Sequence, residues 1–243
     1  MDKQSKVPDD GIQVQFKECP HHGSYLAFVT GGWHSGCSAC ALEDAAAEST
    51  RRYPLEPSRR DPEMEQKLRN IGVPERFVSS RFGNYWPTGE DQWAVFRLIE
   101  SYVANFELAR KDGRNLLLLG QSGTGKTHLA VAVLSKLAER GLRVRYMDAR
   151  KRIGMLSCMP EFLVIDNIGD VQSERQIEPV RTILLDRYDA GLPTLLASNL
   201  ARVSFERVLG DAVRDRLSES GSMLANFVWE SFRKHPKYSN NNQ

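Results

Sequence analysis

The sequence predicts an α/β fold in which a parallel β-sheet of the P-loop type is flanked by helices and preceded by a small cysteine-bearing module. Three observations lead to this prediction. Short apolar runs alternate with helical segments, a glycine-rich motif follows the first of these runs, and two close pairs of cysteine and histidine residues stand near the N-terminus.

The composition is that of a globular protein. Of the 243 residues, 41% are apolar and 26% are charged, which suits one sizeable domain with a small appendage. With a net charge of +2, any contact with nucleic acid needs a local basic cluster. Apolar runs such as 116–119 are too short to span a bilayer, and the opening MDKQSKVPDDG lacks the apolar centre of a secretory signal. We therefore expect a cytoplasmic protein that does not contact membranes.

Composition divides the chain into four segments. Residues 1–18 are polar without periodicity, which predicts a flexible N-terminus. Residues 19–47 hold three of the four cysteines. Residues 48–63, ESTRRYPLEPSRRDPE, are charged and punctuated by proline, as expected for a linker. Residues 64–243 form the body, and the chain contains no internal repeat.

The N-terminal module carries a pattern of metal ligands. Cys19 and His22 have C-x-x-H spacing, and Cys37 and Cys40 have C-x-x-C spacing, with glycines beside both pairs. Four such ligands suit a tetrahedral Zn²⁺ site, and a module this small needs a stabilising metal in order to fold. The alternatives are a redox C-x-x-C pair, for which the βαβ context is missing, and unliganded core thiols.

The fourth zinc ligand is less certain than the three cysteines. His21 and His34 stand close enough in the sequence to replace His22. Cys158 lies far from the module, and we expect it to be a buried thiol of the body.

The body begins with a helix and continues as alternating strands and helices. Thr88 and Asp91 form a possible capping pair for a helix in which apolar residues recur at helical spacing up to Phe106. We expect this helix to pack on the sheet. The predicted strands are Leu116–Leu119, Leu142–Met147, Phe162–Ile165 and Thr194–Ala197, in the rhythm of a parallel sheet covered on both faces.

A phosphate-binding loop follows the first strand. The segment GQSGTGKT matches G-x-x-x-x-G-K-[ST] and comprises Gly120, Gln121, Ser122, Gly123, Thr124, Gly125, Lys126 and Thr127. Its glycines let backbone N–H groups surround the phosphates of ATP, its lysine neutralises the β and γ charges, and its threonine can hold Mg²⁺. An amphipathic helix is predicted over Lys126–Glu139, with His128 on its surface.

Two later strands end in polar residues that can complete a nucleotide site. FLVID ends in Asp166, where a sheet of this type places the acid that holds Mg²⁺ through water. The next strand ends in Ser198 and Asn199, which can reach the γ-phosphate or the attacking water. The alternative is a strand that ends in ordinary turn residues.

These motifs together resemble the bacterial helicase loaders of the DnaC type, which are AAA+ proteins related to the IstB transposition helper ATPases. The likeness covers Ile71–Arg233 and rests on the phosphate loop, NIGVPERFVSSRFGNY, FLVIDNIGD, PTLLASNL, GDAVRDRL and FVWESFR. It implies that Asn199 senses the γ-phosphate, that Arg216 is the finger completing a neighbouring subunit's site, and that Arg233 is the second sensor. Without the resemblance, Arg216 reads equally as part of a solvated helix face.

The resemblance also implies a function. It points to a loader that binds ATP, forms a nucleotide-dependent homo-oligomer, engages a replicative DNA helicase and assists its delivery onto single-stranded DNA. It further implies an AAA+ domain without a C-terminal helical lid. The rival hypotheses are a transposition helper that binds duplex DNA and a transposase, and a nucleotide-gated adaptor that does not hydrolyse ATP.

Two departures from the family pattern limit this function. The family carries an acid after the Mg²⁺-associated aspartate, whereas Asn167 stands here, so we expect slow ATP hydrolysis unless Asp170 serves instead. The helical insert that faces single-stranded DNA in the family is largely missing from DARKRIGMLSCMP. DNA binding there would depend on Arg150, Lys151 and Arg152, which read equally as a solvated cluster.

Overall fold

The computed structural model describes residues 13–20, 23–30, 33–34, 61–151, 158–171 and 173–234. The chain folds as two compact units, Met1–Pro54 and Leu55–Gln243. In the first unit, β1 (Gln13–Cys19), β2 (Gly23–Thr30) and β3 (Trp33–His34) form an antiparallel sheet in that order.

The predicted zinc ligands cannot be placed from this sheet. The side chain of Cys19 and the residues His22, Cys37 and Cys40 lie outside the described residues. Among the side chains that are described, no three His, Cys, Asp or Glu residues group as a metal site requires. The zinc site therefore stays a prediction.

The second unit is built on a five-stranded parallel sheet of order β5-β6-β7-β4-β8. Its strands are β4 (Leu116–Gly120), β5 (Val144–Asp148), β6 (Phe162–Asp166), β7 (Thr194–Ser198) and β8 (Met223–Phe227). Every residue of β6 and β7 is buried, because these strands lie inside the sheet with both faces covered. The edge strands β5 and β8 each carry one exposed residue.

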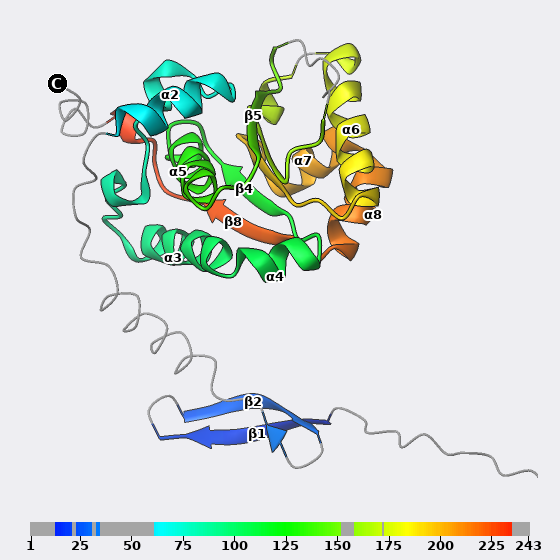
Figure 1. The fold of residues 1–243 in the computed structure, drawn as a ribbon. Helices are drawn as coiled ribbons and strands as arrows, with labels where there is room; N and C mark the ends of the chain where they lie inside the picture. The colour runs from blue at the N-terminus through cyan, green and yellow to red at the C-terminus, as the bar shows by residue number, and fades with distance from the viewer. Residues whose placement is uncertain are drawn as a thin grey trace, which may run out of the picture. The chain divides into compact units, whose positions relative to one another are not determined.

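Helices cover both faces of this sheet (Figure 1). One face packs against α2 (Pro62–Asn70), α3 (Glu90–Ala104), α4 (Phe106–Lys111) and α5 (Lys126–Glu139). The other packs against α6 (Glu174–Asp189), α7 (Arg202–Leu209) and α8 (Asp211–Glu219). Short 3-10 helices lie at Glu75–Phe77 (η1), Phe82–Asn84 (η2), Ile168–Asp170 (η3) and Phe232–Lys234 (η4).

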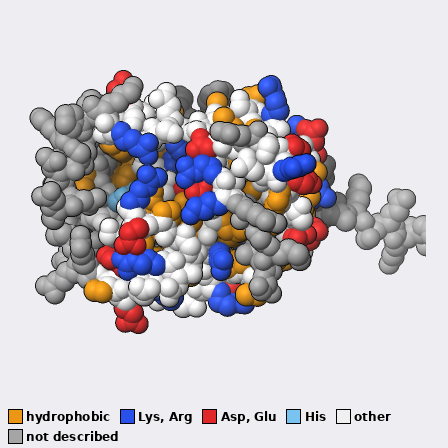
Figure 2. All heavy atoms as spheres, turned by 90° about the horizontal axis from the view of Figure 1, so that it is seen from above, with side chains coloured by type: hydrophobic (Ala, Val, Ile, Leu, Met, Phe, Trp, Pro, Cys, Tyr) orange, Lys and Arg blue, Asp and Glu red, His pale blue; other side chains and the backbone are white. Residues whose placement is uncertain are grey.

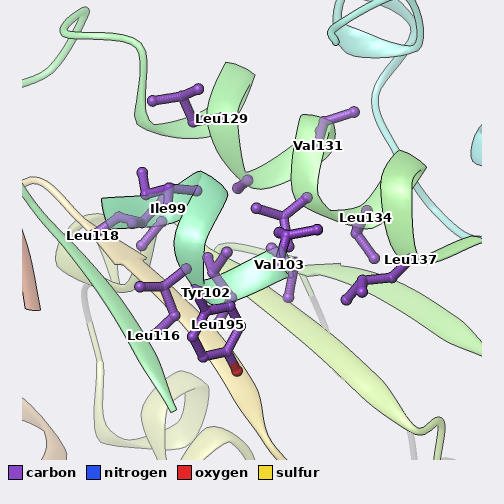
Figure 3. Packing of buried hydrophobic residues seen from close by; sticks show 14 of the residues in the cluster. Ile99, Tyr102, Val103, Leu116, Leu118, Leu129, Val131, Leu134, Leu137 and Leu195 are labelled. Atoms are coloured by element: carbon purple, nitrogen blue, oxygen red, sulfur yellow. The ribbon is translucent and has the colours of Figure 1, made fainter. Parts of the chain in front are cut away.

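The sheet and its helices enclose two apolar cores. In the first, Ile99 of α3, Leu134 of α5 and Leu118 of β4 are fully buried in one cluster (Figure 3). Each such side chain stabilises the fold by about 1.5–3 kcal/mol. Together the layers confirm the predicted parallel α/β sheet, and they place the carboxyl ends of the strands at one edge.

Three local predictions were wrong or incomplete. Thr88 and Asp91 do not cap α3, because Gln92 turns back and its Oε1 accepts hydrogen bonds from the backbone N and the Oγ1 of Thr88. Cys158 is exposed rather than buried. Strand β8 was not foreseen from the apolar pattern.

Within the described residues, no helix has the length and apolar character needed to cross a membrane.

Candidate nucleotide-binding site

The phosphate loop connects β4 to α5 in a conformation that needs glycine. Gly123 and Gly125 have φ angles of 81° and 97°, in the region that side chains disfavour. A Cβ on Gly123 would collide with the side chain of Ser231, and a Cβ on Gly125 would lie 2.6 Å from the Tyr85 ring. The loop is therefore held closely by segments on either side of it in the sequence.

The segment that follows β8 forms hydrogen bonds with this loop. The indole Nε1 of Trp229 donates to the carbonyl of Thr124 at 3.0 Å, and the backbone N of Phe232 donates to the carbonyl of Gly123 at 2.9 Å. Both bonds use carbonyl groups of the loop rather than its N–H groups. They also bring Arg233, the next residue, to the cleft beside the loop.

Lys126 is folded back into the loop. Its Nζ donates to the carbonyl oxygens of Gly120 and Gln121, both at 2.6 Å. Burial lowers the pKa of Lys126 to about 8, with a further lowering from the charge of Arg233 and an opposing rise from the Asp166 carboxylate. The ammonium group is thus poised to lose its proton slightly above neutral pH, unless an anion stabilises it.

ATP binding at about pH 9 should therefore take up close to one proton per chain, because the phosphates raise the pKa of Lys126 again. For the same reason, ATP affinity should fall as the pH rises above about 8. Calorimetric titrations in two buffers of different ionisation enthalpy measure this uptake. In Lys126→Arg, whose guanidinium stays charged, the uptake should vanish. Equal uptake by both proteins would show that another group titrates.

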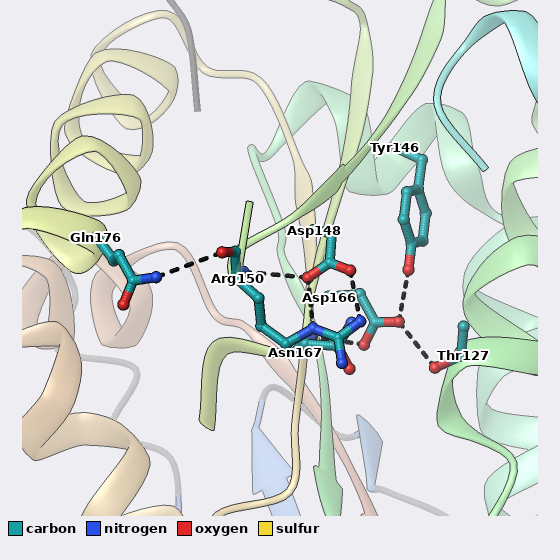
Figure 4. Close-up of polar contacts among 7 residues, drawn as sticks. All are labelled: Thr127, Tyr146, Asp148, Arg150, Asp166, Asn167 and Gln176. Atoms are coloured by element: carbon teal, nitrogen blue, oxygen red, sulfur yellow. Dashed lines mark hydrogen bonds and ion pairs between the residues drawn. The ribbon is translucent and has the colours of Figure 1, made fainter. Parts of the chain in front are cut away.

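At the end of β6, the Asp166 carboxylate accepts three hydrogen bonds (Figure 4). Its Oδ2 accepts hydrogen bonds from Thr127 Oγ1 at 2.8 Å and from Tyr146 OH at 2.7 Å, and its Oδ1 accepts from the backbone N of Asn167 at 2.8 Å. Burial and the Asp166 carboxylate raise the pKa of Tyr146, so the phenol remains a donor. The threonine hydroxyl and the carboxylate are oxygen ligands of the kind that Mg²⁺ prefers, so these residues fit that ion.

Asn167 occupies a strained position in the backbone. Its φ of 62° is the one positive value among the described residues other than glycine. Asparagine tolerates this left-handed conformation better than most residues. The sharp turn from β6 into η3 is therefore one reason for an asparagine at position 167, separate from any catalytic role of its side chain.

At the neighbouring strand end, Arg150 of the predicted basic cluster is paired with an acid. The Arg150 guanidinium forms a two-bond ion pair with Asp148, at 2.9 and 2.7 Å (Figure 4). Burial raises the pKa of Asp148, but hydrogen bonds from Arg150 and the Asn167 side chain outweigh it and leave that pKa low. Lys151 is exposed, and Arg152 lies outside the described residues.

Asn199, at the end of β7, is paired with an acid. Its Nδ2 donates to Asp170 Oδ1 at 2.6 Å, and its Oδ1 is buried without a hydrogen-bond partner. The amide fits against Gly169, where a Cβ would collide with it. Asp170, which the sequence suggested only as a substitute, thus lies beside the predicted γ-phosphate sensor.

One cleft unites most of the predicted residues. The predicted side chains lining it are Ser122, Lys126, Thr127, Asp166, Asn167, Ser198, Asn199 and Arg233. It is also lined by Asp170, which the sequence suggested only as a substitute base, and by four residues to which the sequence assigned no role, namely Arg76, Phe77, His128 and Phe232. Figure 2 shows Lys and Arg side chains gathered across the middle of the face seen from above, with acidic side chains among them. A cleft of mixed charge that includes three basic side chains suits a metal-bound polyanion.

His128 differs from its predicted surface position. Its ring is half-buried, lies 5.4 Å from the Tyr85 ring, and has Nε2 3.0 Å from the carbonyl oxygen of Arg81. Burial lowers the pKa of His128, so it is neutral at pH 7.

Among the predicted catalytic residues, Arg216 is the one that does not line the cleft. It lies on α8, where its guanidinium stacks 5.6 Å from the centre of the Tyr188 ring and its side chain donates to the Ala212 carbonyl at 3.3 Å. Its Nε is buried without a partner. The side chain therefore contacts α6 and α8 of its own chain rather than its own phosphate loop.

Comparison with known proteins gives the family. The model of the family described as IstB-like ATP binding protein matches residues 96–238. The replicative helicase loader DnaC of Escherichia coli K12 is 29% identical over 204 residues, which cover 75% of this chain and 81% of that protein.

Solved structures agree with the fold. The crystal structure of the DnaC helicase loader matches with a TM-score of 0.55 at 26% identity, covering 63% of this chain and 99% of that one. The crystal structure of DnaI also has a TM-score of 0.55, at 19% identity, covering 66% and 94%. The predicted resemblance and the AAA+ fold class are thereby confirmed.

Proposed function

The chain belongs to the family of IstB-like ATP binding proteins, and from this premise we propose that it is a helicase loader in DNA replication. In this proposal, ATP-bound chains engage a replicative helicase and assist its delivery onto single-stranded DNA. The observation that carries the proposal is the cleft in which Lys126, Thr127, Asp166, Asn199 and Arg233 converge from four segments of the chain. The similarity to DnaC of Escherichia coli supports the choice of partner.

Each residue of the cleft has a role in this proposal. The loop Gly120–Thr127 surrounds the phosphates with backbone N–H groups, and Lys126 leaves the loop carbonyls to neutralise the β and γ charges. Thr127 and Asp166, already hydrogen-bonded to each other, would hold Mg²⁺. When bound, the ion neutralises charge that develops on the phosphates.

Arg233 and Asn199 approach the terminal phosphate from two sides. Arg233 lies in the segment after β8 that contacts the loop, and Asn199 directly follows β7. Arg216 acts on the nucleotide of an adjacent copy, which requires a nucleotide-dependent homo-oligomer. This assignment is supported by the absence of Arg216 from the lining of its own chain's cleft and by the partnerless Nε.

ATP hydrolysis is slow in this proposal. Asn167 can orient a water molecule through its amide but cannot accept a proton. This observation keeps a second candidate open, a nucleotide-gated adaptor that assembles with ATP and is released by exchange. The family name also keeps the transposition helper as an alternative partner class.

The loader function is tested with purified helicase from the same cell. Single-stranded DNA covered by its binding protein resists helicase entry, and the chain with ATP and Mg²⁺ should increase helicase activity on it. The chain with Lys126→Ala should not. No stimulation by the wild-type chain with any replicative helicase of that cell would contradict the proposal.

We further propose that the N-terminal module binds zinc through Cys19, His22, Cys37 and Cys40 and forms the contact with the helicase. The ligand spacing and the small size of the module support this assignment. Protein purified without chelators should carry about one Zn²⁺ per chain. The double variant Cys37→Ser, Cys40→Ser should lose the metal while ATP binding persists. Metal analysis that finds no zinc in fresh protein would overturn this assignment.

A further inference from the structure

The turn after β6 carries no carboxylate at position 167, where the family pattern has one. The next carboxylate along the chain belongs to Asp170. Asn167 has the left-handed φ of 62°, which glutamate adopts at a cost. The 3-10 helix η3 begins directly after it and ends at Asp170, whose backbone N donates to the Asn167 carbonyl at 3.0 Å. This turn reverses the chain direction, so Asp170 lies in the cleft lining.

Asp170 is held in the cleft by a short hydrogen bond. Its Oδ1 accepts from Asn199 Nδ2 at 2.6 Å, and both side chains line the same cleft as Lys126 and Asp166. Its charge is close enough to raise the pKa of Lys126. Gly169 leaves the space in which the Asn199 amide lies, so the pair is built by η3 and β7 together.

We propose that Asp170, positioned by Asn199, is the catalytic residue that accepts the proton of the attacking water in place of an acid at position 167. This inference rests on the proposed binding and hydrolysis of ATP. In the step, the water oxygen forms a bond to the γ-phosphorus, and the bond from that phosphorus to the bridging oxygen breaks with its electron pair going to ADP. The proton released by the water passes to the Asp170 carboxylate.

The pairing of Asp170 with Asn199 also accounts for the slow ATP hydrolysis proposed above. Asp170 is exposed and stands at the end of a single 3-10 turn, whereas Asp166 is buried at the end of a strand and accepts three hydrogen bonds. A base that is less rigidly held and shares its carboxylate with Asn199 is less well preorganised for the transition state.

The test compares ATP affinity and single-turnover hydrolysis in the full chain with Mg²⁺. Asp170→Asn retains an acceptor for Asn199 but cannot take the proton, so the rate should fall by about 10²–10⁴ or to the Lys126→Ala background. ATP affinity should not weaken, because the change removes a negative charge near the phosphates. Asp170→Glu should restore part of the rate. Glu178→Gln, an exposed acid paired with Arg181 on α6, is the control and should match the wild type.

Two results would overturn the inference. One is hydrolysis by Asp170→Asn at the wild-type rate. The other is wild-type hydrolysis no faster than the Lys126→Ala background. If ATP still binds and helicase stimulation persists in either case, only the inference fails, whereas loss of ATP binding by the wild type would also contradict the proposed function.

Discussion

Arg216→Ala should abolish ATP-dependent self-assembly and reduce ATP hydrolysis by about 10³–10⁵, while an isolated chain still binds ATP normally. The reason is geometric, because Arg216 lies on α8 against Tyr188 and does not line the cleft of its own chain. We therefore propose that Arg216 acts on the phosphate of an adjacent copy. Sedimentation with and without ATP, together with equilibrium ATP binding at low protein concentration, measures the two effects separately.

The same helix offers a matched control for this prediction. Arg214 is exposed and paired with Asp211 at 2.7 Å and with Asp215 at 3.2 Å, so Arg214→Ala should change neither assembly nor hydrolysis greatly. Mixing Arg216→Ala with Lys126→Ala should recover part of the activity, because one variant supplies the loop and the other supplies the arginine. Weakened ATP binding by isolated Arg216→Ala, as severe as in Lys126→Ala, would refute a role between subunits.

Asp166→Ala should remove the gain in ATP affinity that Mg²⁺ provides and reduce hydrolysis by at least about 10²–10³. The carboxylate is the one acceptor that links Thr127 of the loop, Tyr146 of β5 and the turn at Asn167. Its loss leaves Thr127 without the partner that orients its hydroxyl. Titrations of ATP with Mg²⁺ and with a chelator give the affinity ratio, which should approach one in the variant.

Tyr146→Phe separates this effect from simple loss of packing. It removes one hydrogen bond to Asp166 but keeps the buried ring and the carboxylate. We expect it to retain most of the Mg²⁺ dependence at a cost in unfolding free energy of about 1 kcal/mol. Unchanged Mg²⁺ dependence in Asp166→Ala would remove this aspartate from the metal site.

The sheet could be predicted because its signals are local. The apolar runs at residues 116–119, 162–165 and 194–197 lie within the strands β4, β6 and β7, and the predicted helix Lys126–Glu139 coincides with α5. Strand β8 escaped prediction because its sequence MLANF mixes buried and exposed positions at the edge of the sheet.

The remainder of the cleft could not be predicted from local patterns, because it is assembled from distant segments. Arg76 and Phe77 precede the loop by more than forty residues and Phe232 follows it by more than one hundred, yet all three line the cleft. The pairing of Asp170 with Asn199 depends on how η3 and β7 meet, which no spacing in the sequence encodes. Arg150 likewise reads as a free basic residue in the sequence, whereas the fold pairs it with Asp148.

In the proposed function, ATP binding at this cleft brings the chain onto a replicative helicase. The most direct measurement is recovery of the tagged chain from its own cells, with ATP and Mg²⁺ or with a chelator, followed by mass spectrometry. We predict that the replicative helicase is enriched with the wild-type chain in ATP and is lost with Lys126→Ala. Recovery of a transposase in place of the helicase, or equal helicase recovery by both proteins, would contradict the loader function.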